Sequence, residues 1–186
     1  MVPLTSLWAP ILLSAVLVFV ASSIFHMVLP FHRKDYRKVP AEDDVMAALR
    51  PFAIPPGDYV MPLAGTPAAM KSPEFLDKMN KGPVVMMTVM PSGPPAMGST
   101  FVLWFAFCVL VSVFAGYVAG RALGPGVRYL DVFRFAGTVA FIGYSVALWQ
   151  NSIWYKRDWG TTLRSTIDGL IYGMLTAGSF GWLWPK

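Results

Sequence analysis

The side chains best suited to chemistry are a few ionisable residues in or beside long apolar runs. Asp168 stands at the start of the last run, and Asp131 and Arg134 stand three residues apart at the start of the run before it. Ionisable groups inside a membrane are costly and often functional. Asp168 is therefore a candidate proton- or cation-binding carboxylate. The structural alternatives are a charge at a helix start for Asp168 and a boundary ion pair between Asp131 and Arg134.

The two histidines offer a weaker signal. His26 lies one turn before the end of the first apolar run, and His32 follows six residues later. On a continuous helix their side chains would point about 120° apart, and Pro30 interrupts the helix between them. This is not the spacing of a helical metal-binding pair, so the sequence predicts no haem or metal site and no cofactor. His32 is expected at the membrane boundary.

Sulfur chemistry and enzyme motifs add little. The single cysteine, Cys108, cannot form an intramolecular disulfide and is expected to behave as a small hydrophobic residue. Thioethers bind Cu(I), but the methionines form no repeated metal-binding array and are expected to pack against a membrane or a partner. No hydrolase elbow, phosphate loop, dinucleotide fingerprint or zinc-protease motif is present. The sequence predicts no catalytic residue; a membrane enzyme would need polar side chains to converge on His26 or His32.

Composition points to a membrane protein. Hydrophobic residues make up 55% of the 186 residues and charged residues only 13%, whereas soluble domains carry about 25% charged residues. The net charge of +5 comes from Lys and Arg beside apolar runs. This placement favours the anionic head groups of a lipid bilayer as the partner. No nucleic-acid-binding motif is present, so binding to nucleic acid is not expected.

Four membrane-spanning helices are predicted, at about residues 7–29, 100–120, 132–152 and 167–184. The first of these rises about 34 Å as a helix, enough to cross a hydrocarbon core of about 30 Å. The last run is the shortest. The expected fold class is an all-α integral membrane protein with a four-helix transmembrane bundle, forming a single membrane domain over residues 1–186.

The connection over residues 31–98 is expected to lie outside the membrane. Two short helices are predicted in it, at about 41–50 and 73–81, the second with Ser72 as its N-cap. An apolar segment at 83–90 is too short to span and is expected to be a strand or an extended stretch. Eleven Lys and Arg fall in this connection and in the third one. The excess predicts that the long connection is cytoplasmic and that both termini lie outside.

Small residues recur at every fourth position of the apolar runs, so they lie on one face of each helix. Such faces allow close helix packing in lipid. The pattern favours packing within one bundle, and the alternative is a docking face for another subunit or a second copy. The packing-face residues are Ser165, Gly169, Gly173, Ala177 and Gly181 in the last run, and Ser112, Gly116 and Gly120 in the second.

Two segments carry a resemblance to known proteins. Residues 167–185, and residues 31–50 with their His-x-x-Asp-Tyr sequence, resemble small bacterial multi-pass membrane proteins of unknown function. The resemblance implies a bacterial inner-membrane location and no assigned activity. The leading expectation is a non-catalytic accessory or assembly subunit of a membrane complex. The alternative is a small transporter or an ion- or proton-conducting protein that uses Asp168 with Asp131 and Arg134.

Overall fold

The computed structural model describes residues 1–186 and is mostly helical. Contacts along the chain divide it into two compact units. One unit combines Met1–Arg37 with Ala96–Lys186, and the other is Lys38–Pro95.

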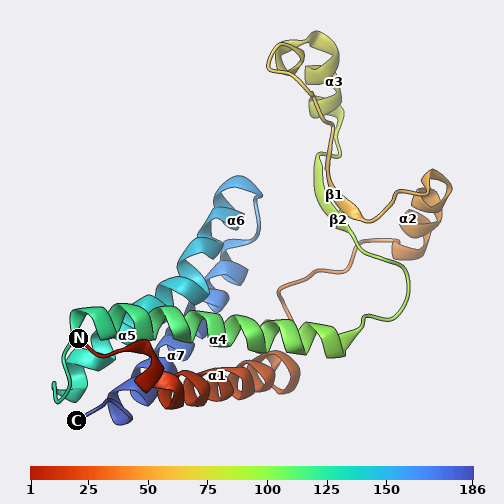
Figure 1. The fold of residues 1–186 in the computed structure, drawn as a ribbon. Coiled ribbons are helices and arrows are strands. Elements are labelled where there is room, and N and C mark those ends of the chain that lie inside the picture. Colours follow the sequence, from red (N-terminus) through yellow and green to blue (C-terminus); the bar gives the residue numbers. More distant parts are fainter. The chain divides into compact units, whose positions relative to one another are not determined.

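Long apolar helices build the first unit (Figure 1). Three helical segments are long and apolar enough to cross a membrane, namely Leu4–Val28, Met97–Ala122 and Tyr129–Trp154. They overlap the first three predicted spans, and no charged residue interrupts their central turns. The helices of this unit are α1 (Trp8–Ser23), α4 (Met97–Ala122), α5 (Tyr129–Ser145), α6 (Trp149–Trp154) and α7 (Trp159–Trp182).

The last helix, α7, begins earlier than the sequence analysis expects. Asp158 caps it, because its Oδ2 accepts a hydrogen bond from the Thr161 N–H at 3.2 Å. The helix therefore starts at Trp159, and Asp168 lies in its third turn. The predicted role of Asp168 as a charge at a helix start is wrong. The first turns of α7 are polar, which explains why it is not among the three apolar segments.

The four long helices pack in a ring. Helix α1 contacts α4, α4 contacts α5, α5 contacts α7, and α7 closes the ring against α1. Two clusters of buried residues fill the interior. One contains Leu7, Ala136 and Phe180, and the other contains Val18 and Cys108. Cys108 is fully buried, as expected of a small hydrophobic residue.

Hydrogen bonds tie both chain ends to the last turn of α4 and to the connection between α4 and α5. The Val2 N–H donates to the Gly120 carbonyl at 2.8 Å, and Trp184 Nε1–H donates to the Gly124 carbonyl at 3.0 Å. Gly126 N–H donates to the Pro185 carbonyl at 3.0 Å. The two termini lie at the same end of the bundle (Figure 1). Successive long helices therefore run in alternating directions.

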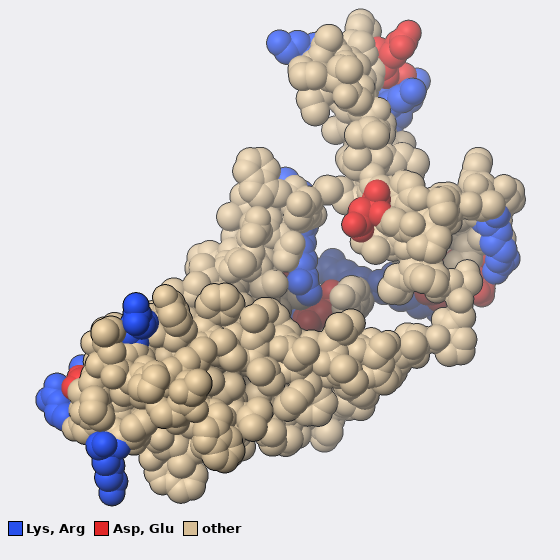
Figure 2. All heavy atoms as spheres, in the orientation of Figure 1, with Lys and Arg blue, Asp and Glu red and all other residues tan.

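The outer surface of the bundle is apolar. Figure 2 shows a surface without charged residues along α1 and α4, and charged residues towards the ends of the helices. Large hydrophobic side chains on this surface are exposed, among them Leu12, Val20, Leu103 and Leu110. An apolar surface of this extent is unfavourable in water and favourable against lipid.

The second unit is built on a β-hairpin. Strand β1 (Gly57–Met61) pairs antiparallel with β2 (Val85–Val89), and Gly57 lies opposite Val89. Helix α2 (Glu42–Leu49) precedes the hairpin, and α3 (Pro73–Lys81) lies within its connection (Figure 1). The strand in the 83–90 segment fits one of the two predicted forms. Its pairing with β1 was not predicted, so the fold is not wholly α-helical.

Candidate metal centre

The end of α1 brings the two histidines together. After Ser23 the helix widens into a π-helical turn, Ile24–Val28, closed by a hydrogen bond from Leu29 N–H to the Ile24 carbonyl at 3.0 Å. Leu29 is extended, as expected for a residue that precedes proline. Pro30 then starts a 3₁₀ turn over Pro30–His32. The chain reverses within these few residues, so the continuous-helix geometry no longer applies to His26 and His32.

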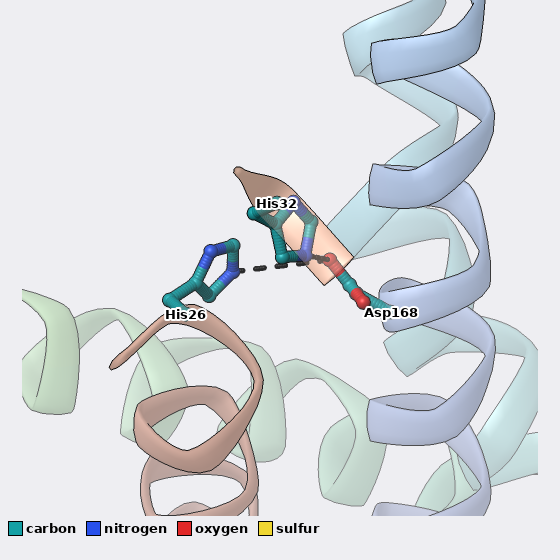
Figure 3. Close-up of side chains that lie close together, drawn as sticks. All are labelled: His26, His32 and Asp168. Carbon is teal, nitrogen blue, oxygen red and sulfur yellow. Dashed lines mark ion pairs between the residues drawn. The ribbon is translucent and has the colours of Figure 1, made fainter. Parts of the chain in front are cut away.

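The two imidazole rings stack beside a carboxylate from α7 (Figure 3). The ring centroids of His26 and His32 are 4.0 Å apart, with 26° between the ring planes. Asp168 Oδ2 lies 2.9 Å from His32 Nε2 and 3.8 Å from His26 Nε2. One potential ligand atom from each of the three residues falls within 4.8 Å of the others. Three candidate residues from the sequence therefore form one cluster.

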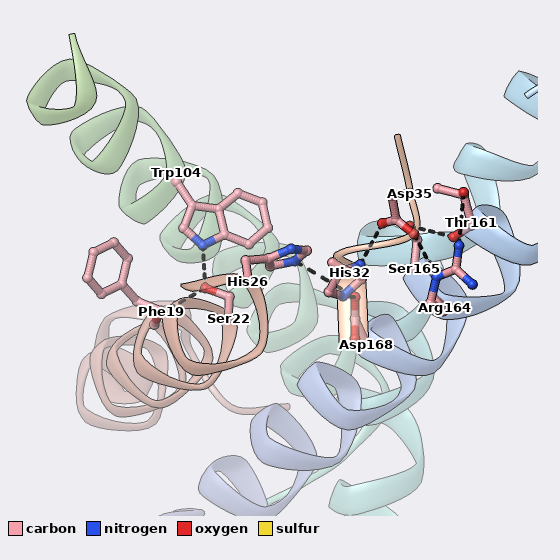
Figure 4. A network of polar contacts seen from close by, with 10 residues as sticks. All are labelled: Phe19, Ser22, His26, His32, Asp35, Trp104, Thr161, Arg164, Ser165 and Asp168. Atoms are coloured by element: carbon pink, nitrogen blue, oxygen red, sulfur yellow. Dashed lines mark hydrogen bonds and ion pairs between the residues drawn. The ribbon is translucent and has the colours of Figure 1, made fainter. Parts of the chain in front are cut away.

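A second carboxylate and an arginine hold His32 from its other side (Figure 4). His32 Nδ1 lies 2.7 Å from Asp35 Oδ2. Arg164 Nε–H donates to Asp35 Oδ1 at 2.6 Å, and Arg164 Nη2–H donates to Thr161 Oγ1 at 3.2 Å. These contacts join the turn after α1 to the first turns of α7. They fix the rotamers of His32 and Asp35 without any covalent link.

The hydrogen bonds to the Asp35 carboxyl favour its ionised form. Burial of the Asp35 carboxyl acts to raise its pKa, but hydrogen bonds from His32 and Arg164 outweigh this effect and lower the pKa below its ordinary value. An ionised carboxylate only accepts hydrogen bonds. The hydrogen shared with His32 therefore sits on Nδ1, and Nε2 of the same ring faces Asp168.

The side chains of His32 and Asp168 are buried, but some of their polar atoms form no hydrogen bond. The side chains of His32 and Asp168 are 9% and 5% exposed. His32 Nε2 and Asp168 Oδ1 are nonetheless buried atoms with no hydrogen-bond partner. His32 Nε2 lies within ion-pair distance of Asp168 Oδ2, but it has no hydrogen-bond partner. Buried polar atoms without partners are rare and call for an explanation such as a bound ion.

Aromatic side chains pack near the cluster. Tyr172 lies one turn along α7 from Asp168. Its ring stacks on the ring of Phe25, with 6.2 Å between the ring centroids. Trp104 packs against Tyr172, and its Nε1–H donates to Ser22 Oγ at 2.7 Å (Figure 4). By contrast, the His26 side chain is 50% exposed. Of the three cluster residues, His26 is therefore the one whose side chain is open to the surroundings.

Asp131 and Arg134 lie elsewhere. Asp131 is in the first turn of α5, where Arg128 Nε–H donates to its Oδ2 at 3.0 Å. The predicted partner Arg134 is more distant, with Nη1 3.9 Å from Asp131 Oδ1. Asp168 lies near the C-terminal end of α5. This follows from the contact of the adjacent Gly169 with Ser145, the last residue of α5. About fourteen helical residues, or roughly 21 Å, separate the two ends.

The small-residue faces meet other helices of the same unit. A Cβ added at Gly169 would overlap the Ser145 side chain, and one at Gly173 would lie 3.1 Å from the Gly137 carbonyl oxygen. A Cβ at Gly116 would lie 3.1 Å from the Phe180 ring. Ser112 Oγ accepts a hydrogen bond from Ser14 Oγ at 2.9 Å. Three further members of these faces, Gly120, Ala177 and Gly181, are also close to neighbouring segments. The last member, Ser165, donates a hydrogen bond within its own helix, to the Thr161 carbonyl at 3.1 Å.

Sequence reasoning missed two members of the cluster. Asp35 follows His32 at the i+3 position, a spacing at which side chains meet in a helical turn. That spacing is present in the His-x-x-Asp-Tyr sequence and was a usable signal. Arg164 is 129 residues from Asp35, and its only sequence signal was a positive charge near the last apolar run.

Comparisons with protein-family models, curated proteins and solved structures find no match to this chain.

Proposed function

We propose that this chain is a four-span membrane protein that binds a divalent transition-metal cation, such as Zn²⁺, through His26, His32 and Asp168. The observation that carries the proposal is that His32 Nε2, a buried atom with no hydrogen-bond partner, lies 2.9 Å from Asp168 Oδ2 and within 4.8 Å of the third potential ligand atom, on His26. A cation between the lone pairs would satisfy both groups. Two imidazoles and one carboxylate form a ligand set that suits zinc and related metals.

The distances fit such a site. Ligand atoms about 2.1 Å from a tetrahedral zinc ion lie about 3.4 Å from one another. The two separations from Asp168 Oδ2, 2.9 Å and 3.8 Å, lie on either side of this value, and all three ligand atoms fall within 4.8 Å of one another. His26 is half exposed and is the ligand with room to adjust. With three protein ligands, a fourth position is left for water or another small ligand, as in zinc sites that react.

The contacts behind His32 support metal binding. Metal-ligating histidines commonly donate their second N–H to a carboxylate, which fixes the tautomer and increases the basicity of the ligand. Asp35 accepts from His32 Nδ1 at 2.7 Å, and Arg164 holds Asp35 in turn. This arrangement leaves His32 Nε2 as the ligand atom.

Metal binding accounts for the contacts of Asp168 better than ion conduction does. The aromatic residues Phe25, Trp104 and Tyr172 pack against one another, and Tyr172 lies one helical turn after Asp168. The transporter hypothesis pairs Asp168 with Asp131 and Arg134, but those residues lie at the other end of α5. The accessory-subunit hypothesis rests on the small-residue faces and on the lack of a catalytic cluster, and most residues of those faces contact other segments of the same unit. Metal binding is supported by contacts that neither alternative explains.

We place α7 as the fourth span. Its 24 residues rise about 36 Å, enough to cross a bilayer. Its polar side chains are mostly turned inward: Thr161, Thr162 and Thr176 are buried, and Thr176 Oγ1 donates to the Tyr172 carbonyl. We propose a bacterial inner-membrane location, and the lysine and arginine excess supports a metal centre on the cytoplasmic side with both termini outside.

Metal binding is tested on the full chain purified in mild detergent. The protein is stripped with a chelator and titrated with Co²⁺, whose visible absorption reports the ligand geometry, and with Zn²⁺ in competition. We expect one equivalent of metal per chain. The variants His32→Ala and Asp168→Asn should weaken binding by at least about tenfold, since each removes one direct ligand.

Asp131→Asn is the matched control, because it neutralises an aspartate of the same unit outside the cluster. It should leave the metal affinity unchanged. The proposal fails if the wild-type chain binds no stoichiometric metal, or if Asp168→Asn binds as tightly as Asp131→Asn. Far-ultraviolet circular dichroism of each variant establishes that the helices are retained.

A further inference from the structure

A second polar feature adjoins the metal centre without belonging to it. The segment after the Pro30–His32 turn and the start of α7 enclose an open hollow of about 390 Å³. This volume is within the range of about 300–1,000 Å³ typical of small-molecule sites. Its lining residues are Arg33, Lys34, Tyr36, Arg37, Asp158 and Arg164.

The hollow carries an excess of unpaired positive charge. Four of its six lining residues are Lys or Arg, and one is acidic. Of the ion pairs in the structure, none involves Arg33, Lys34 or Arg37. Cations held this close repel one another unless an anion lies between them.

The remaining charged residues are already engaged. Asp158 caps α7 through the Thr161 N–H, so its negative charge is directed at the helix start. Arg164 donates through Nε to Asp35 and through Nη2 to Thr161. Arg164 is thus a fixed cation at the inner wall of the hollow, while Arg33, Lys34 and Arg37 provide exposed cations at its rim.

We infer that this hollow binds the phosphate group of an anionic phospholipid. Guanidinium groups match phosphate oxygens in a bidentate fashion, which favours phosphate over a smaller anion. The hollow directly follows the end of the apolar segment Leu4–Val28, where the head groups of a bilayer would lie. Trp159, whose side chain is 56% exposed, stands next to Asp158 as an interfacial aromatic residue.

Short-chain lipids test this inference on the full chain in detergent. The protein is titrated calorimetrically with dihexanoyl phosphatidylglycerol, with dihexanoyl phosphatidylcholine, and with inorganic phosphate alone. We expect saturable binding of one phosphatidylglycerol, at least about tenfold tighter than phosphatidylcholine, because each basic residue near a lipid surface contributes on the order of 1 kcal/mol. The double variant Arg33→Gln/Arg37→Gln should lose this preference.

The matched control is Lys71→Gln/Lys78→Gln, which removes the same charge from the second unit. It should bind phosphatidylglycerol like the wild type. Equal loss in both double variants, or no preference between the two lipids, would overturn the inference. So would inorganic phosphate binding as tightly as phosphatidylglycerol, since the site would then serve free phosphate. If the double variant does not fold, the single variant Arg37→Gln is compared with Lys71→Gln.

Discussion

At the scale of single residues, His32 is the centre of the site because it faces two carboxylates. Its Nδ1 contacts Asp35 at 2.7 Å and its Nε2 lies 2.9 Å from Asp168. The two acids are not equivalent. Asp35 is paired with Arg164 and therefore stays ionised, whereas Asp168 has no arginine or lysine partner. A cation at Asp168 would balance the second carboxylate in the same way that Arg164 balances the first.

The role of Asp35 yields a prediction that separates positioning from direct binding. We expect Asp35→Asn to weaken metal binding by about 10- to 100-fold, because it removes the acceptor that orients His32. Bound Co²⁺ should still show the absorption of three protein ligands, since His26, His32 and Asp168 remain. Metal titration of the purified variant, together with its Co²⁺ spectrum, measures both effects.

Asp43→Asn serves as the control for charge, because Asp43 is exposed on α2 and lies in the second unit. It should leave affinity and spectrum unchanged. If Asp35→Asn binds metal with wild-type affinity, the contact with His32 has no positioning role.

At the scale of elements, the apolar runs were predictable and the turns between them were not. The first three predicted spans overlap the segments Leu4–Val28, Met97–Ala122 and Tyr129–Trp154, because long uncharged runs leave the backbone no alternative to helix in lipid. Helix α3 follows the Ser72–Pro73 signal, and Ser72 Oγ accepts from the Phe75 N–H at 3.2 Å. These features depend on nearby residues only.

The candidate site depends on contacts that local patterns do not encode. His26 and His32 meet because α1 ends in a π-helical turn before Pro30, and no residue type specifies such a turn. Asp35 meets Arg164 only after α1 and α7 have packed together. The pairing of β1 with β2 is likewise set by strands far apart in the sequence. Composition therefore predicted the helices, whereas the cluster required the tertiary arrangement.

The close contact of α5 with α7 makes the bundle sensitive to a larger side chain at the contact. We expect Gly173→Ala to destabilise the bundle by about 1–3 kcal/mol, because overpacking at a rigid interface forces the helices apart. A Cβ there would lie 3.1 Å from the Gly137 carbonyl oxygen and 3.2 Å from the Phe141 backbone nitrogen. Thermal or denaturant unfolding in detergent measures the loss.

Gly178→Ala makes the same change in the same helix where there is room. A Cβ at Gly178 would have its nearest contact at 3.7 Å, an ordinary distance. This variant should be neutral or slightly stabilising, because alanine has the higher helix propensity. Equal effects of Gly173→Ala and Gly178→Ala would show that helix propensity, and not the contact with α5, decides the outcome.

At the scale of the whole molecule, the hydrogen bonds at the chain ends bear on the number of spans. The C-terminal Trp184 and Pro185 bond to Gly124 and Gly126 in the α4–α5 connection. The metal-centre residues of α7 instead contact the turn that follows α1. Because α7 reaches from one end of the bundle to the other, we propose that it crosses the same layer as the neighbouring helices.

If α7 is the fourth span, the long connection and the C-terminus lie on opposite sides of the native membrane. In a Cys108→Ala background, we introduce Ser92→Cys in the long connection, Tyr155→Cys between α6 and α7, and Lys186→Cys at the C-terminus. A membrane-impermeant maleimide should label the first two from the cytoplasmic face and the third from the opposite face, because α7 separates them. Right-side-out and inverted vesicles allow each face to be probed in turn. Labelling of Tyr155→Cys and Lys186→Cys from the same face would mean that α7 does not cross, leaving three spans and a metal centre whose α7 ligand approaches from outside the bilayer.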